Sequence, residues 1–142
     1  MLNTNPRGTT KPLKPPLTLA AEDFDRLSSL AAAVTNRSPE LSDPLLAEID
    51  RSRVVGAAHL APDVVRMGSH VEFRDETTGK VQSVRLVYPG DADIEAGRIS
   101  ILTPIGIALI GLSTGQLISW TTRGGEQRVL RVLAVGPPEV AA

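Results

Sequence analysis

The chain of 142 residues contains no cysteine, which excludes a disulfide framework, a thiolate metal site and a thiolate nucleophile. Aromatic side chains are also scarce, so valine, leucine, isoleucine and alanine must build the core; there are only Phe24, Phe73, Tyr88 and Trp120. A net charge of −1 argues against strong direct nucleic-acid binding, which needs many phosphate-neutralising Lys and Arg side chains. No apolar run approaches the roughly 20 residues that cross a bilayer, and no N-terminal segment resembles a secretory signal. We therefore expect a cytoplasmic protein with no membrane contact.

What is present begins with a proline-rich tail, residues 1–16. It contains four prolines and three basic side chains, Arg7, Lys11 and Lys14. Such a segment buries too little apolar surface to offset its ordering entropy, so we predict that it is disordered. Its basic side chains could contact a phosphate or an acidic partner.

Two helical patterns follow within residues 17–60. Over 20–35 apolar residues recur at spacings of three and four, and acidic residues fall in the first turn, where the helix dipole favours them. Ser42-Asp43-Pro44 predicts the start of a second helix that continues to about Val55, with Glu48 facing mostly outward. The short connection predicts an antiparallel helical hairpin, a small coiled coil about 20 Å long.

From Pro62 the apolar residues alternate with polar ones, which indicates strands. They are predicted over 71–75, 81–88, 98–102, 116–122 and 127–135, with hairpin turns at Gly79 and around Arg123-Gly124-Gly125. Between the third and fourth strands, Thr103 and Pro104 suit the start of a helix and Gly111 its end, which predicts a short buried helix over 104–110. Strands with a lone helix, led by a helical hairpin, indicate an α+β protein whose second domain covers 61–142.

No group of side chains forms a catalytic, cofactor or metal motif. His59 and His70 have no acid or second ligand at metal spacing. The acidic loop with Asp91, Asp93 and Glu95 lacks the twelve-residue pattern and the closing glutamate of a calcium loop. We therefore expect no enzyme activity, no cofactor and no metal.

Several motifs do occur together and in order. They are LAEIDRS (Leu46–Ser52), LAPDVVRMGSHVEF (Leu60–Phe73), LVYP (Leu86–Pro89), DAD (Asp91–Asp93), GRIS (Gly97–Ser100) and TPIGIALIGLSTGQLISW (Thr103–Trp120). Over about residues 17–138 the chain resembles the bacterial regulators of nucleoside diphosphate kinase (Rnk), relatives of the Gre transcript-cleavage factors through a shared C-terminal domain.

The resemblance implies an FKBP-like C-terminal domain, in which a curved antiparallel sheet wraps one short helix, and it implies RNA polymerase as partner. In Gre factors the corner between strand and helix lies on the polymerase-facing edge, which corresponds here to Leu102, Thr103 and Pro104, with threonine in place of serine. Gre factors insert a long helical hairpin into the secondary channel of the polymerase, where acidic residues at its tip help to hold a catalytic metal. The tip here offers only Glu40 and Asp43, on a hairpin too short to reach that metal.

The resemblance therefore implies a non-enzymatic transcription regulator that binds RNA polymerase near the secondary channel. It would compete with or modulate Gre factors without stimulating transcript cleavage. Three alternatives stay open. The first is a peptidyl-prolyl isomerase-like enzyme, which the FKBP-like fold suggests and the few aromatic residues disfavour. The others are a true cleavage factor and a direct regulator of nucleoside diphosphate kinase.

Overall fold

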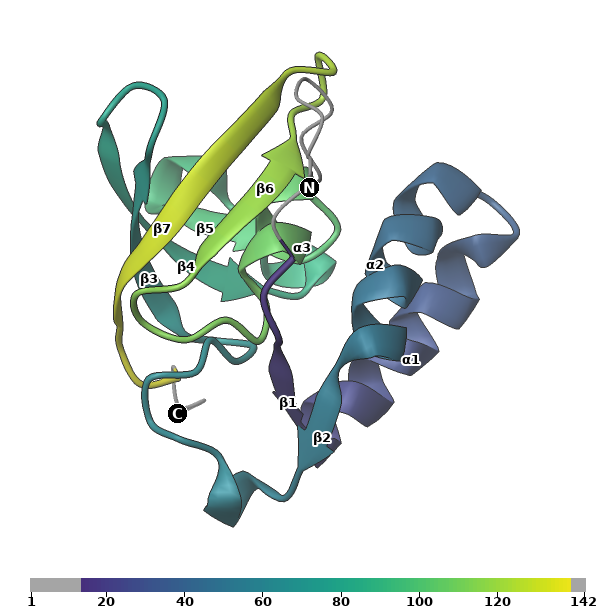
Figure 1. Ribbon diagram of the computed structural model, residues 1–142. Helices are drawn as coiled ribbons and strands as arrows, with labels where there is room; N and C mark the ends of the chain where they lie inside the picture. The colour runs from purple at the N-terminus through teal and green to yellow at the C-terminus, as the bar shows by residue number, and fades with distance from the viewer. Residues whose placement is uncertain (1–13, 139–142) are drawn as a thin grey trace, which may run out of the picture.

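The computed structural model describes residues 14–138, in which a pair of helices stands beside a curled sheet (Figure 1). The helices are α1 (Ala21–Thr35), α2 (Pro39–Arg51) and α3 (Pro104–Leu109), with short 3-10 turns η1 (Ala57–His59), η2 (Pro89–Asp91) and η3 (Ile94–Ala96). The strands are β1 (Thr18–Ala20), β2 (Arg53–Val55), β3 (His70–Asp75), β4 (Val81–Val87), β5 (Arg98–Ser100), β6 (Leu117–Thr121) and β7 (Gln127–Val135). The mixture of helices and strands agrees with the predicted α+β class.

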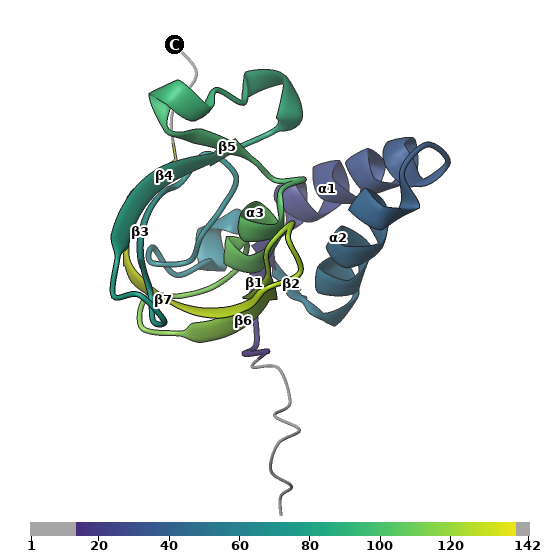
Figure 2. The same cartoon turned by 90° about the horizontal axis from the view of Figure 1, so that it is seen from above.

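Helices α1 and α2 lie side by side and run in opposite directions (Figures 1 and 2). Apolar side chains at helical spacing are buried along both of them: Leu27, Ala31 and Val34 on α1, and Leu45 and Ile49 on α2. The helices have 15 and 13 residues, which corresponds to about 20 Å each at 1.5 Å per residue. Most of their stability therefore comes from this shared apolar face.

The predicted bounds of the second helix are wrong at both ends. The helix begins at Pro39, directly after Ser38, because proline is favoured at the first helical position and Pro39 precedes Pro44; the Ser38 side chain makes no cap hydrogen bond. Pro44 then lies inside α2, where it removes one backbone donor. At the other end the helix stops at Arg51, because the next residues form β2.

A two-stranded parallel pair, which the sequence did not predict, joins the two ends of the hairpin. β1 and β2 pair in register from Thr18 with Arg53 to Ala20 with Val55. The backbone N–H of Thr18 also donates to the carbonyl of Gly111, at 3.0 Å, just beyond α3. Gly111 has φ +80°, and a Cβ there would lie 2.8 Å from Cδ1 of Leu17. The close approach therefore depends on glycine, and it fastens the base of the hairpin to the rest of the chain.

The second sheet has five strands in the order β5-β4-β3-β7-β6 and curls around α3 (Figure 2). The expectation of a wholly antiparallel sheet is wrong, because β4 and β5 are parallel. Their connection, residues 88–97, turns back so that β5 begins beside Arg85, two residues before the end of β4, and so β5 repeats the direction of β4. Within the curl, apolar residues of the sheet and of α3 form a single core with those of the hairpin, for example Leu27, Leu45, Leu86, Leu109, Leu130 and Val132.

Other local predictions agree with the structure. The strands at β3, β4, β6 and β7 and the helix α3 differ from the predicted bounds by one residue at most. Gly79 and Gly125 both have positive φ in their hairpin turns. Within residues 14–138 no helix is long and apolar enough to span a bilayer.

Candidate functional site

The corner between β5 and α3, Leu102–Pro104, is fixed by its own side chains. The hydroxyl of Thr103 donates to the carbonyl of Ser100 at 2.7 Å and accepts from the N–H of Gly106 at 3.1 Å. Pro104 follows at the first helical position. A Cβ on Gly106 would lie 2.4 Å from the carbonyl oxygen of Ser100, so only glycine allows the helix to start this close to the strand. The predicted N-cap role of Thr103 is confirmed.

This corner separates two surface hollows. The first, which we call the α2–α3 groove, has a volume of about 360 Å³ and runs between α2, the corner and β6. Its apolar lining includes Leu41, Pro44, Leu102, Pro104, Ile107 and Trp120. The second has a volume of about 540 Å³ and lies between the corner, Ile94 of the 89–97 loop and Arg123 of the β6–β7 turn. Half-buried Leu102, Thr103 and Pro104 therefore form a ridge between two concave surfaces.

The two predicted acidic residues of the hairpin tip differ in their relation to this ridge. Both are exposed on α2, in its first turns and not in the connecting loop, because the helix begins earlier than predicted. Glu40 lines the α2–α3 groove together with Leu102 and Pro104, whereas Asp43 does not. Within residues 14–138 no three acidic or histidine side chains are placed to hold a metal ion. The structure thus brings Glu40, but not Asp43, to the same surface as the corner.

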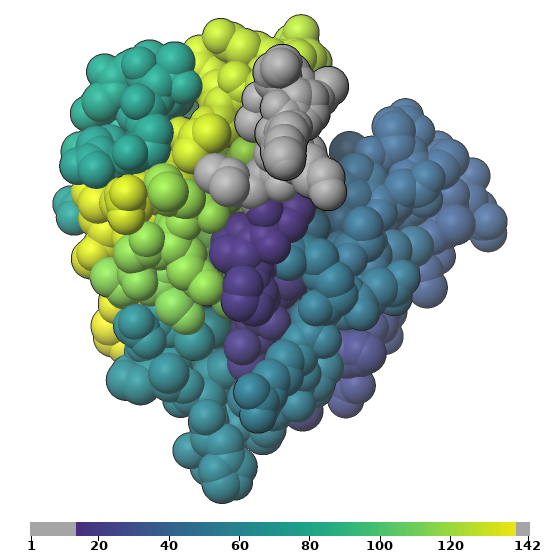
Figure 3. Space-filling model, in the orientation of Figure 1, coloured from purple at the N-terminus to yellow at the C-terminus, as the bar shows by residue number. Residues whose placement is uncertain are grey.

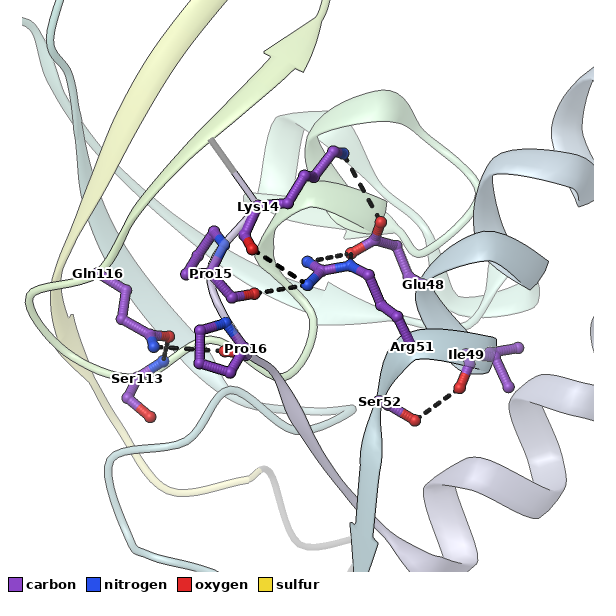
Figure 4. A network of polar contacts seen from close by, with 9 residues as sticks. All are labelled: Lys14, Pro15, Pro16, Glu48, Ile49, Arg51, Ser52, Ser113 and Gln116. Atoms are coloured by element: carbon purple, nitrogen blue, oxygen red, sulfur yellow. Dashed lines mark hydrogen bonds and ion pairs between the residues drawn. The ribbon is translucent and has the colours of Figure 1, made fainter. Parts of the chain in front are cut away.

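Glu48, which the sequence analysis placed outward, is a buried carboxylate on the wall of the same groove (Figure 4). Arg51, three residues further along α2, donates to one of its oxygens from Nε at 3.1 Å and from Nη2 at 2.8 Å. Lys14 approaches the other oxygen, with 3.6 Å between Nζ and Oε2. Arg51 also donates from Nη1 to the carbonyl of Pro15 at 2.6 Å. The i, i+3 spacing of Glu48 and Arg51 predicts an ion pair between them from the sequence. The burial of Glu48 is explained only by the additional contacts with Lys14 and Pro15.

A third, smaller hollow lies at the mouth of the curled sheet. It has a volume of about 140 Å³, and two of the four aromatic residues, Phe73 and Trp120, line it together with Asp75. Asp75 Oδ2 accepts from Arg128 Nη1 at 2.5 Å, and its Oδ1 accepts from the N–H of Thr77 at 2.8 Å. Burial alone would raise the pKa of Asp75, but these hydrogen bonds outweigh it and hold the pKa below its ordinary value. The carboxylate is therefore committed to shaping the β3–β4 turn.

Comparison with known proteins assigns the family. Residues 60–137 match the family described as transcription elongation factor GreA/GreB, C-terminal part, and residues 15–55 match the Rnk N-terminus. The regulator of nucleoside diphosphate kinase of Escherichia coli K12 is 33% identical over 129 residues, which cover 90% of this chain and 95% of that protein. The chain belongs to the Rnk family. The resemblance seen in the sequence motifs is thereby confirmed.

Gre factors are related to this Rnk-family chain over a shorter stretch. Transcription elongation factor GreA of Acidiphilium cryptum is 38% identical over 87 residues, or 61% of this chain and 55% of GreA. A solved GreA/GreB structure from Nitrosomonas europaea is 36% identical, covers 84% of this chain and 98% of its own, and superposes with a TM-score of 0.68. The curled sheet with its helix is thus the GreA/GreB C-terminal fold. The relatives are regulators or transcription factors.

The two Rnk-family regions are also joined by polar contacts at the base of the hairpin. The buried carboxylate of Asp23, on α1, accepts from the backbone N–H of Met67 at 3.1 Å, and Nε of Arg66 lies 4.0 Å from it. Burial raises the pKa of Asp23 above its ordinary value, although the Met67 and Arg66 contacts partly oppose this. Arg26 lies over the ring of Tyr88, 4.2 Å from its centre. The helix dipole alone accounts for acidic residues in this turn of the sequence, and only the structure reveals Asp23 as a link between the two regions.

Proposed function

We propose that this Rnk-family protein is a non-enzymatic transcription regulator that binds RNA polymerase near the secondary channel and competes with or modulates Gre factors. The observation that carries the proposal is the α2–α3 groove, which places Glu40 of the hairpin on one surface with Leu102 and Pro104. Leu102 and Pro104 belong to the corner that the Gre resemblance assigns to the polymerase-facing edge, and Glu40 belongs to the acidic tip of the hairpin. Because both parts line one groove, a single partner can contact hairpin and corner together. Such a role implies a cytoplasmic location.

We further propose that the protein does not stimulate transcript cleavage. The hairpin helices of 15 and 13 residues reach only about 20 Å, which is shorter than the projection that the resemblance implies for Gre factors. Asp43 does not line the groove with Glu40, and within residues 14–138 no third acidic or histidine side chain is placed to complete a metal site with these two. The chain should therefore not stimulate cleavage in backtracked complexes. Cleavage that is lost in the double variant Glu40→Ala and Asp43→Ala would contradict this proposal.

The experiment that tests polymerase binding is a competition assay with core RNA polymerase and a Gre factor. The chain should displace the Gre factor, and Leu102→Asp combined with Pro104→Ala should weaken this binding at least about tenfold, since a charge on an apolar contact leaves it desolvated and unpaired. Val81→Asp is the matched control, because Val81 is 49% exposed and lines none of the three hollows. Circular dichroism and melting curves verify the fold of each variant. Binding that both variants keep would move the interface away from the corner.

An isomerase is the second candidate, because Phe73 and Trp120 share the pocket at the mouth of the sheet in an arrangement that we interpret as FKBP-like. Its volume of about 140 Å³ is below the roughly 300–1,000 Å³ of small-molecule sites. We therefore expect no catalysis of proline isomerisation in a peptide assay. Clear catalysis that is lost with Trp120→Ala would favour the isomerase instead. A direct action on nucleoside diphosphate kinase, which rests on the name of the relatives, would appear as co-purification with that kinase in the absence of polymerase.

A further inference from the structure

The α2–α3 groove is the surface on which the described chain begins. Lys14, its first residue, lines the groove, and the matched family regions start only at residue 15. Figure 3 shows the purple N-terminal segment between the blue hairpin and the green-to-yellow sheet. Whatever precedes Lys14 therefore leaves from the groove itself.

The point of departure is fixed on both sides (Figure 4). On the α2 side, Arg51 donates from Nη1 to the carbonyls of Pro15 at 2.6 Å and of Lys14 at 3.5 Å while Glu48 holds the rest of its guanidinium. On the β6 side, Gln116 donates from Nε2 to the carbonyl of Pro16 at 3.3 Å. These contacts hold the backbone carbonyls of residues 14–16, so the position at which the preceding segment joins the groove is fixed.

The chemistry of the preceding segment fits the groove. Residues 6–13, PRGTTKPL, combine apolar Pro12 and Leu13 with basic Lys11 and Arg7. The groove has an apolar lining that includes Trp120, and exposed Glu40 on its α2 wall. Proline-rich segments bind aromatic-lined grooves at low entropic cost because their extended conformation is partly preformed. At about 3.1 Å per residue, eight such residues reach roughly 25 Å, slightly more than the length of the hairpin.

We propose that residues 6–13 bind in the α2–α3 groove of the same chain, with Pro12 and Leu13 against its apolar lining and the basic side chains toward Glu40. Bound there, the segment covers Leu102 and Pro104 and competes with any partner for them. The Arg51–Glu48 clamp is then a positioning device that directs the segment into the groove. Docking is supported by the apolar lining of the groove, the Arg51–Glu48 clamp, and the opposite charges of Glu40 and the basic side chains. Only the regulatory consequence of docking rests on the proposed function.

The absence of native cysteine makes the docking measurable by disulfide trapping in the full chain. One cysteine replaces Thr10 in the tail, and a second replaces Thr121, an exposed residue that lines the groove. The matched control pairs the same Thr10→Cys with Thr114→Cys, another exposed threonine, which does not line the groove. In a glutathione buffer the rate of intramolecular bond formation reports the effective concentration of the two thiols. We expect the groove pair to close at least about tenfold faster than the control pair.

A full-chain variant with Arg7→Glu and Lys11→Glu should bring the two rates together, because the reversed charges face Glu40. Equal rates in the unreversed chain would overturn the docking. Disulfide-linked dimers at low protein concentration would overturn it in favour of a second copy as occupant. A rate ratio that charge reversal leaves unchanged would overturn the role given to Glu40.

Polymerase binding forms a separate arm of the experiment. The oxidised groove pair should bind polymerase at least about tenfold more weakly than its reduced form, because the corner is covered. Equal binding by the two forms would overturn the competition. If even the reduced form fails to bind, the proposed function fails, while the trapping rates still decide whether the segment occupies the groove.

Discussion

The hairpin and the curled sheet are held together in different ways. In the sheet, β3 pairs along its length with β4 and β7, and the edge strands β5 and β6 pair on one side, so backbone hydrogen bonds add to the buried face of every strand. The hairpin has no such ladder beyond the three residues of β1 and β2. It depends on one apolar face and on individual contacts at its base, such as Asp23 with Met67. The sheet is therefore stabilised both by backbone hydrogen bonds and by core packing, whereas the position of the hairpin depends on a few side chains.

A core substitution in each region is the strongest way to probe this difference. Leu45, between the helices, and Leu130, in the sheet, are both fully buried and belong to one continuous core. Truncation of either to alanine should lower the free energy of unfolding by about 3 kcal/mol. Since the core is shared, helix loss followed by circular dichroism and sheet loss followed by Trp120 fluorescence should coincide in a urea titration of each variant. Separate transitions in Leu45→Ala would show that the hairpin unfolds on its own.

The junction of the two regions can be broken at Gly111. Alanine there must adopt φ near +80° and press its Cβ against Leu17, so we expect a loss of about 2 kcal/mol in the free energy of unfolding. Gly115→Ala is the matched control, because Gly115 also has positive φ, +91°, but a Cβ there meets nothing within 4 Å. It should cost about 1 kcal/mol, from backbone strain alone. Equal costs for the two variants would mean that contact with Leu17 contributes nothing.

The smallest effects should come from two carboxylates, one in each region, whose pKa values shift in opposite directions. The raised pKa of Asp23 means that its contribution to stability is present at low pH and is lost as the pH rises through its folded-state value. The lowered pKa of Asp75 means that its contribution is present at neutral pH and is lost as the pH falls below about 4. Asp23→Asn should therefore gain stability relative to the native chain between pH 4 and pH 7.

Asp75→Asn should lose most at pH 7 and least at pH 3. Urea titrations at pH 3, 5 and 7 measure both effects on the same scale. A parallel pH dependence of the two variants would contradict the opposite environments of the two carboxylates.

The sequence predicted well the elements whose signals are local. Thr103, Pro104 and Gly111 gave α3 its bounds because capping and proline preferences act over only a few residues. It predicted poorly whatever depends on distant segments. β1 and β2 have three residues each, too few for a period, and they exist because the ends of the hairpin meet.

The candidate site divides in the same way. Leu102, Thr103 and Pro104 came from the family resemblance, and the corner that they form is where it was expected. Glu48 was assigned to the wrong face, because a carboxylate pattern cannot reveal that Arg51 and Lys14 will neutralise it. Asp43 was paired with Glu40 on sequence proximity, but only Glu40 reaches the groove. The predicted start of α2 was wrong because two proline start signals, Pro39 and Pro44, lie five residues apart.

The pairing of β1 with β2 has a consequence for how such proteins can change. The chain enters the hairpin through β1 and leaves it through β2, and these paired strands are held in place next to Gly111. The two helices can therefore be regarded as an insertion whose two ends are fixed in position. Adding matched turns to α1 and α2 would move the tip outward by about 5.4 Å per turn without displacing the β1–β2 pair or the sheet. The length of the hairpin can thus evolve independently of the strands that anchor it. Related proteins can differ in how far the hairpin tip extends while the β1–β2 pair and the sheet stay the same.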